Sequence, residues 1–166
     1  FFIACTVIGF ALEYAGTSTG ILFGNYTYGH TLGKKFKEVP LIIGLNWFII
    51  IYCNSIAAHT IYRKLIGRLG MANAPVKKWM RNFSLIFDAS LLAVVFDFFM
   101  EPAAVKLGFW EWHNGNIPIY NYTCWFLISF LLTAIFQFLA IDKHNKFAVH
   151  LLLIQLMFFL ILRTFL

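Results

Sequence analysis

The chain has 166 residues, of which 61% are hydrophobic, 19% aromatic and only 12% charged, and its formal net charge is +6. A water-soluble domain carries roughly a quarter charged residues because its surface must be hydrated, so this composition excludes most soluble folds. No nucleic-acid partner is expected, since most phenylalanines lie in uncharged runs and not among Lys and Arg. The solvent that suits such a surface is the lipid bilayer.

Five apolar stretches come close to the roughly 20 residues that a helix needs to cross a bilayer. They are Phe1–Leu12, Leu41 to His59, Phe83–Met100, Thr123–Ile141 and Phe147–Leu166. These stretches are continuously apolar, whereas the strands of a membrane barrel alternate apolar and polar residues. Backbone N–H and C=O groups in lipid must also hydrogen-bond to one another, as they do within a helix. The sequence therefore predicts an all-α, polytopic transmembrane helical bundle of about five spans, in which Pro102 stands just beyond the third.

We expect residues 1–166 to form a single integral membrane domain. Because the chain begins Phe-Phe-Ile without a methionine, we also expect that its native N-terminus lies upstream.

Basic residues gather in one connection, and this predicts the orientation of the bundle. Cytoplasmic loops are enriched in Lys and Arg, so we expect the segment between the second and third spans, which has no acid, to lie in the cytoplasm, together with the loop at Asp142. Glu13–Val39 and Pro102–Pro118 then lie on the outer side of a multi-pass protein of the cell (inner) membrane. The basic residues of the cytoplasmic connection are Arg63, Lys64, Arg68, Lys77, Lys78 and Arg81.

Asp97 and Glu101 are candidate catalytic acids at the outer end of the third span. Four residues apart, they share one helix face with Ser90 and Ala93, and this small, polar face should turn toward other helices. Two carboxyl groups this close in a poorly hydrated site cannot both ionise cheaply, so one should keep its proton. Such an acid, beside an apolar pocket, can protonate a carbon–carbon double bond. The alternative is a headgroup-level pair that binds lipid.

Glu13 is a further candidate, at the end of the first apolar stretch. Behind it, Gly16, Gly20 and Gly24 repeat every four residues. On a helix these glycines would form a groove for another backbone, whereas in a re-entrant segment they would supply positive φ angles. Either arrangement places polar backbone beside Glu13. The alternative is an interfacial Glu that ends a helix.

Two aromatic segments, Phe23–Tyr28 and Gly108–Trp112, flank the candidate acids in the predicted topology. Tyr and Trp often form a belt at the membrane interface. The other interpretation is that their ring faces line a pocket and stabilise a cation, which is worth roughly 0.5 to 2 kcal/mol per ring.

Metal and disulfide sites are not expected. The histidines never occur as HxxxH or HxxHH, and the three cysteines are far apart in apolar surroundings. Asp88, on the helix face opposite Asp97, is interpreted as structural.

An ordered set of motifs between Glu13 and Trp125 resembles the membrane carotenoid-biosynthesis family of the bisanhydrobacterioruberin hydratase and carotenoid 1,2-hydratase type. Two positions depart from the family pattern, since Glu101 stands where Asp is usual before the proline, and Cys124 stands where Gly is usual before the last Trp. The matching residues are Glu13, Thr19-Gly20, Phe23-Gly24, Tyr26, Tyr28, Leu32-Gly33, Val39-Pro40-Leu41, Trp47, Asp97, Glu101-Pro102, Gly108, Trp110, Trp112, Pro118, Asn121 and Trp125.

This resemblance implies that water adds to the terminal double bond of a linear carotenoid such as lycopene, γ-carotene or a C50 type, without a cofactor. It assigns catalysis to Asp97, Glu101 and Glu13. Other carotenoid enzymes are the implied neighbours in the membrane. The implied substrate-binding residues are Tyr26, Tyr28, Phe23, Trp110, Trp112, Asn121 and Trp125.

Two further functions stay open. A membrane carotene cyclase would begin from the same protonated end group but close a ring. A carotenoid- or lipid-binding subunit, or a proton-relay protein, would use the acids without adding water.

Overall fold

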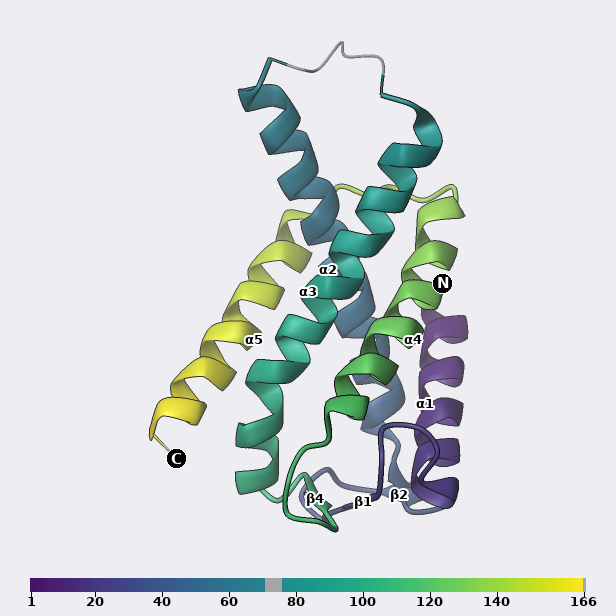
Figure 1. Cartoon of the computed structure of the whole chain (residues 1–166), viewed down its shortest axis with the longest axis vertical. Helices are drawn as coiled ribbons and strands as arrows, with labels where there is room; N and C mark the ends of the chain where they lie inside the picture. Colours follow the sequence, from purple (N-terminus) through teal and green to yellow (C-terminus); the bar gives the residue numbers. More distant parts are fainter. Residues whose placement is uncertain (71–75, 166) are drawn as a thin grey trace.

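The computed structural model describes residues 1–70 and 76–165. Within these ranges it has five helices long and apolar enough to cross a membrane, so the predicted all-α bundle of about five spans is confirmed (Figure 1). The helices are α1 (Phe2–Thr19), α2 (Ile42–Arg68), α3 (Lys78–Lys106), α4 (Ile119–Phe138) and α5 (Lys146–Phe165).

Several helices extend beyond the apolar stretches, and the most informative case is α3. The expectation that this span ends before Pro102 is wrong, because α3 continues through Pro102 to Lys106. Proline interrupts a helix partly because it cannot donate to the carbonyl four residues earlier, which here belongs to Phe98. Nη1 of Arg163 on α5 donates to that carbonyl at 3.2 Å, so the carbonyl is satisfied by another helix.

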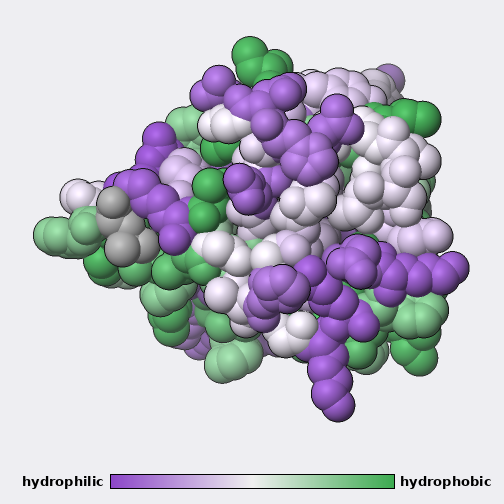
Figure 2. Space-filling view, turned by 90° about the horizontal axis from the view of Figure 1, so that it is seen from below, coloured by the Kyte–Doolittle hydropathy of each residue, from purple (hydrophilic) through white to green (hydrophobic). Residues whose placement is uncertain are grey.

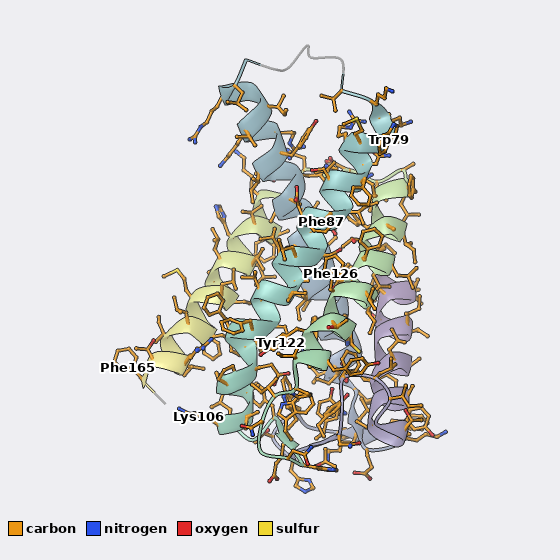
Figure 3. The ribbon with its side chains drawn as sticks, viewed as in Figure 1. Trp79, Phe87, Lys106, Tyr122, Phe126 and Phe165 are labelled. Atoms are coloured by element: carbon orange, nitrogen blue, oxygen red, sulfur yellow. The ribbon has the colours of Figure 1, made fainter. Side chains whose placement is uncertain are left out.

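Helix α2 is the centre of the bundle and packs against the other four helices, while α3 also packs against α4 and α5. Figure 1 shows α1 and α5 at opposite edges. Small residues let α3 and α4 approach closely, and Ser90 Oγ lies 3.1 Å from Thr133 Oγ1 between them. Nearby, the rings of Phe87 and Phe126 meet edge to face at 5.5 Å (Figure 3).

Short strands close one end of the bundle. They lie in the connections α1–α2 and α3–α4, which share this end (Figure 1), as the alternation of spans requires. β1 runs antiparallel to β4, and β2 runs antiparallel to β3. Their bounds are β1 (Tyr26–Tyr28), β2 (Lys35–Phe36), β3 (Val39–Pro40) and β4 (Trp110–Trp112).

Seen from this end, the molecule has a mixed surface. Figure 2 shows polar side chains over the connections and apolar side chains around the rim, where the sides of the helices would face lipid. The assignment of this end to the outer side of the membrane stays a prediction.

The glycine-rich segment after Glu13 is part helix and part turn. Helix α1 continues through Gly16 and is capped by Gly20, which has φ of 66°. Phe23 follows with φ of 65°, and Gly24 with φ of 117°. The expected positive φ angles therefore occur at Gly20 and Gly24, whereas Gly16 is helical and packs against the turn that follows, at Leu22 and Phe23.

Two glycines bring α1 and α2 into close contact. A Cβ atom added at Gly9 would lie 2.5 Å from Cβ and Cγ of Trp47, and one added at Gly44 would lie 2.7 Å from the carbonyl oxygen of Thr6. The packing of Trp47 therefore depends on the absence of a side chain at residue 9.

We predict that Gly9→Ala destabilises the protein, because the new methyl group forces Trp47 or α1 to move, and overpacking of this kind costs about 1–3 kcal/mol. Thermal unfolding in detergent should show a lower midpoint. The matched control is Gly67→Ala on α2, where an added Cβ meets nothing within 4 Å. Equal midpoints for both variants would contradict the prediction.

Candidate active site

A cavity of about 80 Å³ lies behind the strands, where α1, α2, α3, α4 and α5 come together. Its walls are mostly aromatic and aliphatic, and two carboxyl groups reach it, those of Glu13 and Glu101. The lining residues are Glu13, Phe23, Tyr26, Tyr28, Leu32, Ile43, Asn46, Trp47, Ile50, Met100, Glu101, Phe109, Trp110, Trp112, Asn121, Trp125 and Phe159.

Glu13 is buried and its carboxylate is surrounded by donors from two other elements. Oε2 accepts the hydroxyl of Tyr26 and, at 2.7 Å, the hydroxyl of Tyr28. Oε1 accepts the indole N–H of Trp47 at 2.8 Å. Each oxygen of this carboxylate is therefore satisfied, and the group is fixed in the C-terminal half of α1.

Glu101 is held in the same manner from the other side of the cavity. Its Oε2 accepts the indole N–H groups of Trp110 and Trp112, each at 3.0 Å. Its Oε1 accepts the side-chain amide of Asn121 at 3.3 Å. The carboxyl group thus has fixed orientation, with α4 and β4 both contributing.

The strand pair explains why these donors converge. Successive side chains of a strand point to opposite faces, so Trp110 and Trp112 are buried whereas Glu111 between them is exposed. In the same manner Tyr26 and Tyr28 are buried, and they stand opposite Trp112 and Trp110 in the ladder. In this small antiparallel ladder, side chains of β1 therefore hydrogen-bond to Glu13 and side chains of β4 hydrogen-bond to Glu101.

Asp97 lies one turn from Glu101 on α3 and is completely buried. Its Oδ2 accepts the amide of Asn121 at 2.8 Å, and Asn121 thereby connects the two acids. Oδ1 has no hydrogen-bond partner among the described residues. Asp97 is behind Asn121 and does not line the cavity, unlike Glu101 and Glu13.

The remaining predicted binding residues also reach the cavity. The rings of Trp125 and Trp47 stack at 4.3 Å, with planes 19° apart. Phe23 is buried beside them, and its backbone N–H points at Sγ of Cys124 at 3.4 Å. The structure thus brings all the predicted binding residues, Phe23, Tyr26, Tyr28, Trp110, Trp112, Asn121 and Trp125, to one cavity.

The sequence interpretation did not assign several cavity residues to the site. Trp47 belongs to the motif set of the family resemblance, but its bond to Glu13 is not among the predictions from the sequence. A signal was available, because a buried indole N–H normally needs an acceptor, and acids are rare in this chain. Asn46, Met100 and Phe159 also line the cavity, and no sequence pattern distinguishes them from ordinary helix-packing residues.

Other polar groups lie outside the cavity. Nε2 of His59 is 2.7 Å from Oε1 of Gln137, and Nε2 of Gln137 donates to Asn82, so these side chains connect α2, α4 and α3. Asp88 is exposed and accepts the hydroxyl of Ser84. Over the described residues, no group of three or more His, Cys, Asp or Glu side chains could hold a metal ion.

Comparison with known proteins identifies the family. The whole chain, residues 1–166, matches the carotenoid biosynthesis protein family, and the chain belongs to it. It is also 26% identical over 140 residues to bisanhydrobacterioruberin hydratase of Haloarcula japonica. That match covers 82% of this chain but 43% of the relative, so the chain spans less than half of the length of that protein. No solved structure matches the chain.

We predict that Trp47→Phe lowers the stability of the protein. The ring still packs against Trp125, but Oε1 of Glu13 loses its donor, and an unsatisfied buried acceptor costs about 1–3 kcal/mol. Thermal unfolding in detergent measures the change. Trp79→Phe is the matched control because Trp79, at the far end of α3, is 66% exposed (Figure 3). An unchanged midpoint for Trp47→Phe would show that this bond contributes no stability.

The two buried tyrosines should resist ionisation. Burial and the neighbouring Glu13 carboxyl raise the pKa of Tyr28 and that of Tyr26 well above the usual value of 10. We expect the Tyr26→Phe/Tyr28→Phe double variant to show the same phenolate absorbance change as the native protein up to a pH of about 11. A smaller change in the variant would contradict this.

The same shift has a consequence for stability. Since the fold favours the neutral phenols, their contribution is complete below a pH of about 10 and falls as the pH rises beyond it.

Proposed function

We propose that this protein is a carotenoid hydratase that adds water to the terminal double bond of a linear carotenoid. The observation that carries the proposal is the pair of carboxyl groups, on Glu13 and Glu101, that reach a single apolar cavity from different helices. Membership of the carotenoid biosynthesis family and the hydratase name of the distant relative support it.

The cavity has the properties that this reaction requires. A terminal isopropylidene group is apolar and branched, and it must meet an acid in a place with little bulk water. Leu32, Ile43 and Ile50 supply apolar walls, and the acids stand among aromatic rings. Burial of this kind strengthens the electrostatic interactions of a developing cation.

We assign proton donation to Glu101. A proton donor must touch the reacting carbon, and Glu101 lines the cavity whereas Asp97 does not. Asp97 is the positioning partner, because two carboxyl groups joined through Asn121 retain one proton more readily than they ionise together.

We assign activation of the attacking water to Glu13. After protonation of the less substituted carbon, the positive charge rests on the tertiary carbon. Water attacks that carbon, forming the C–O bond, and Glu13 accepts the proton that the water releases. Tyr26 and Tyr28, which donate to Glu13, keep its oxygens at a fixed place. Glu13 then releases this proton and Glu101 takes one up, so both acids return to their starting state, the net reaction consumes one water, and no redox cofactor is needed.

We assign stabilisation of the carbocation to the aromatic rings. The indole N–H groups of Trp110 and Trp112 point at Glu101, so these rings lie beside the acid that gives up its proton. The ring of Tyr26 is 5.2 Å from that of Trp112. Ring faces attract a cation by roughly 0.5 to 2 kcal/mol each, which favours the transition state leading to the tertiary ion.

The proposed setting is the cell (inner) membrane, where a linear carotenoid such as lycopene, γ-carotene or a C50 type dissolves. Other carotenoid enzymes are the proposed neighbours. A carotene cyclase would form the same cation but must exclude water. The fixed Glu13 carboxyl group inside the cavity supports water capture, because it can orient an attacking water and accept its proton.

The test is expression in cells that accumulate lycopene, grown with isotopically labelled water, followed by mass spectrometry of the pigments. We expect the native protein to give a product with labelled oxygen, and Glu101→Gln to lower its yield by about 10²–10⁴-fold. Glu13→Gln and Asp97→Asn should also lower it. Glu111→Gln is the matched control, since Glu111 is on the same strand as the tryptophans but exposed.

Each outcome separates the candidate functions. An isomer without added oxygen would indicate a cyclase, and unchanged pigment would support the binding or relay role. Full activity of Glu101→Gln, with equal amounts of protein in the membrane, would overturn the assignment of the acid.

A further inference from the structure

The cavity can hold the end of a linear carotenoid but not its length. At about 80 Å³ it has the scale of a branched end group together with a water. If the proposed function is right, the rest of the polyene must leave the cavity on a side where apolar chain can lie.

Most sides of the cavity are closed by tightly packed polar and aromatic groups. Glu13 and its tyrosines close the α1 side, and the Trp47–Trp125 stack closes the side between α2 and α4. The side toward α5 differs. Among the described residues of α5, the one that lines the cavity is Phe159, which is uncharged and half-buried, and Ile50 on α2 and Met100 on α3 are further apolar lining residues.

Helix α5 packs closely along its first half and loosely along its second. Of its described side chains, the buried ones are Ala148 and Leu152, both in the first half. Figure 1 shows α5 diverging from α2 toward its C-terminal end, which is the end at the level of the cavity. In Figure 3, Phe165 at the end of α5 lies at the edge of the bundle, farther from its axis than Lys106 at the end of α3.

One polar contact keeps this diverging end attached. Arg163 donates to the carbonyl of Phe98 at 3.2 Å, and its guanidinium lies 4.6 Å from the centre of the Phe98 ring. Between this contact and Leu152, Phe159 meets Phe96 of α3 edge to face, with ring centres 5.8 Å apart. The second half of α5 is thus held at both ends, with Phe159 over the cavity.

We propose that the polyene of the substrate leaves the cavity between α5 and the α2/α3 pair, past Met100 and Phe159, and continues into the bilayer. This inference rests on the proposed function and assigns Phe159 as a specificity-determining residue. An apolar chain gains from burial against such side chains, and a slot that opens sideways lets a long substrate enter from lipid without crossing the polar strand end.

The test compares two hydrocarbons with the same terminal double bond, lycopene and the short isoprenoid farnesene, with the purified protein in lipid nanodiscs. Phe159→Trp narrows the slot, so we expect the ratio of lycopene to farnesene conversion to fall by about tenfold. Phe158→Trp is the matched control, because Phe158 is adjacent but 52% exposed, and its ratio should stay at the native value.

Phe159→Ala should not lower this ratio. The slot becomes wider, so lycopene conversion should be retained relative to farnesene. An unchanged ratio in Phe159→Trp, or an equal fall in both tryptophan variants, would overturn the proposed route.

A second readout keeps this test independent of catalysis. Lycopene that co-purifies with the protein from producing cells measures binding alone, and Phe159→Trp should reduce it while Phe158→Trp should not. If the native protein retains lycopene without hydrating it, the hydratase proposal fails and the co-purified pigment still decides the route. If it neither retains nor converts lycopene, both proposals are overturned.

Discussion

Three carboxyl groups buried at one end of a membrane bundle are the constraint on which this structure depends. An unpaired buried charge is strongly destabilising, so each acid needs donors within the fold. The backbone N–H groups of a helix interior are already used within the helix, and they cannot supply these donors. The donors are therefore side chains from elsewhere, and Tyr28, Trp112 and Asn121 are examples.

This requirement explains the architecture of the strand-bearing end. A ladder of three residue pairs joins the α1–α2 connection to the α3–α4 connection. By itself such a ladder would be marginal, but each strand also donates to a carboxyl group on a helix. The acids and the ladder thus stabilise one another, and the aromatic rings between them form an apolar wall instead of a membrane belt.

Much of the fold could be predicted from sequence, because apolar length and helical spacing are local signals. The five spans and the shared face of Asp97 and Glu101 were of this kind. The orientation of Glu111 away from the cavity could not be read from sequence, because it depends on strand alternation within a ladder whose partner is more than 80 residues away. The bond from Trp47 to Glu13 is only half visible in the sequence, because the indole N–H signals the need for an acceptor but the choice of Glu13 depends on the contact at Gly9. The continuation of α3 through Pro102 cannot be read from local sequence, because the cost of the proline is offset by Arg163, a residue of another helix.

Pro102 has a consequence for how this bundle tolerates change. In an isolated helix, replacing an internal proline with alanine strengthens the helix. Here an alanine at this position could donate its own N–H to the Phe98 carbonyl, in competition with the guanidinium from α5. A local improvement in α3 would then weaken the attachment of the final helix. A change at this residue that stabilises α3 as a helix therefore weakens the packing of α5 on α3. The proline leaves the Phe98 carbonyl free to bind Arg163.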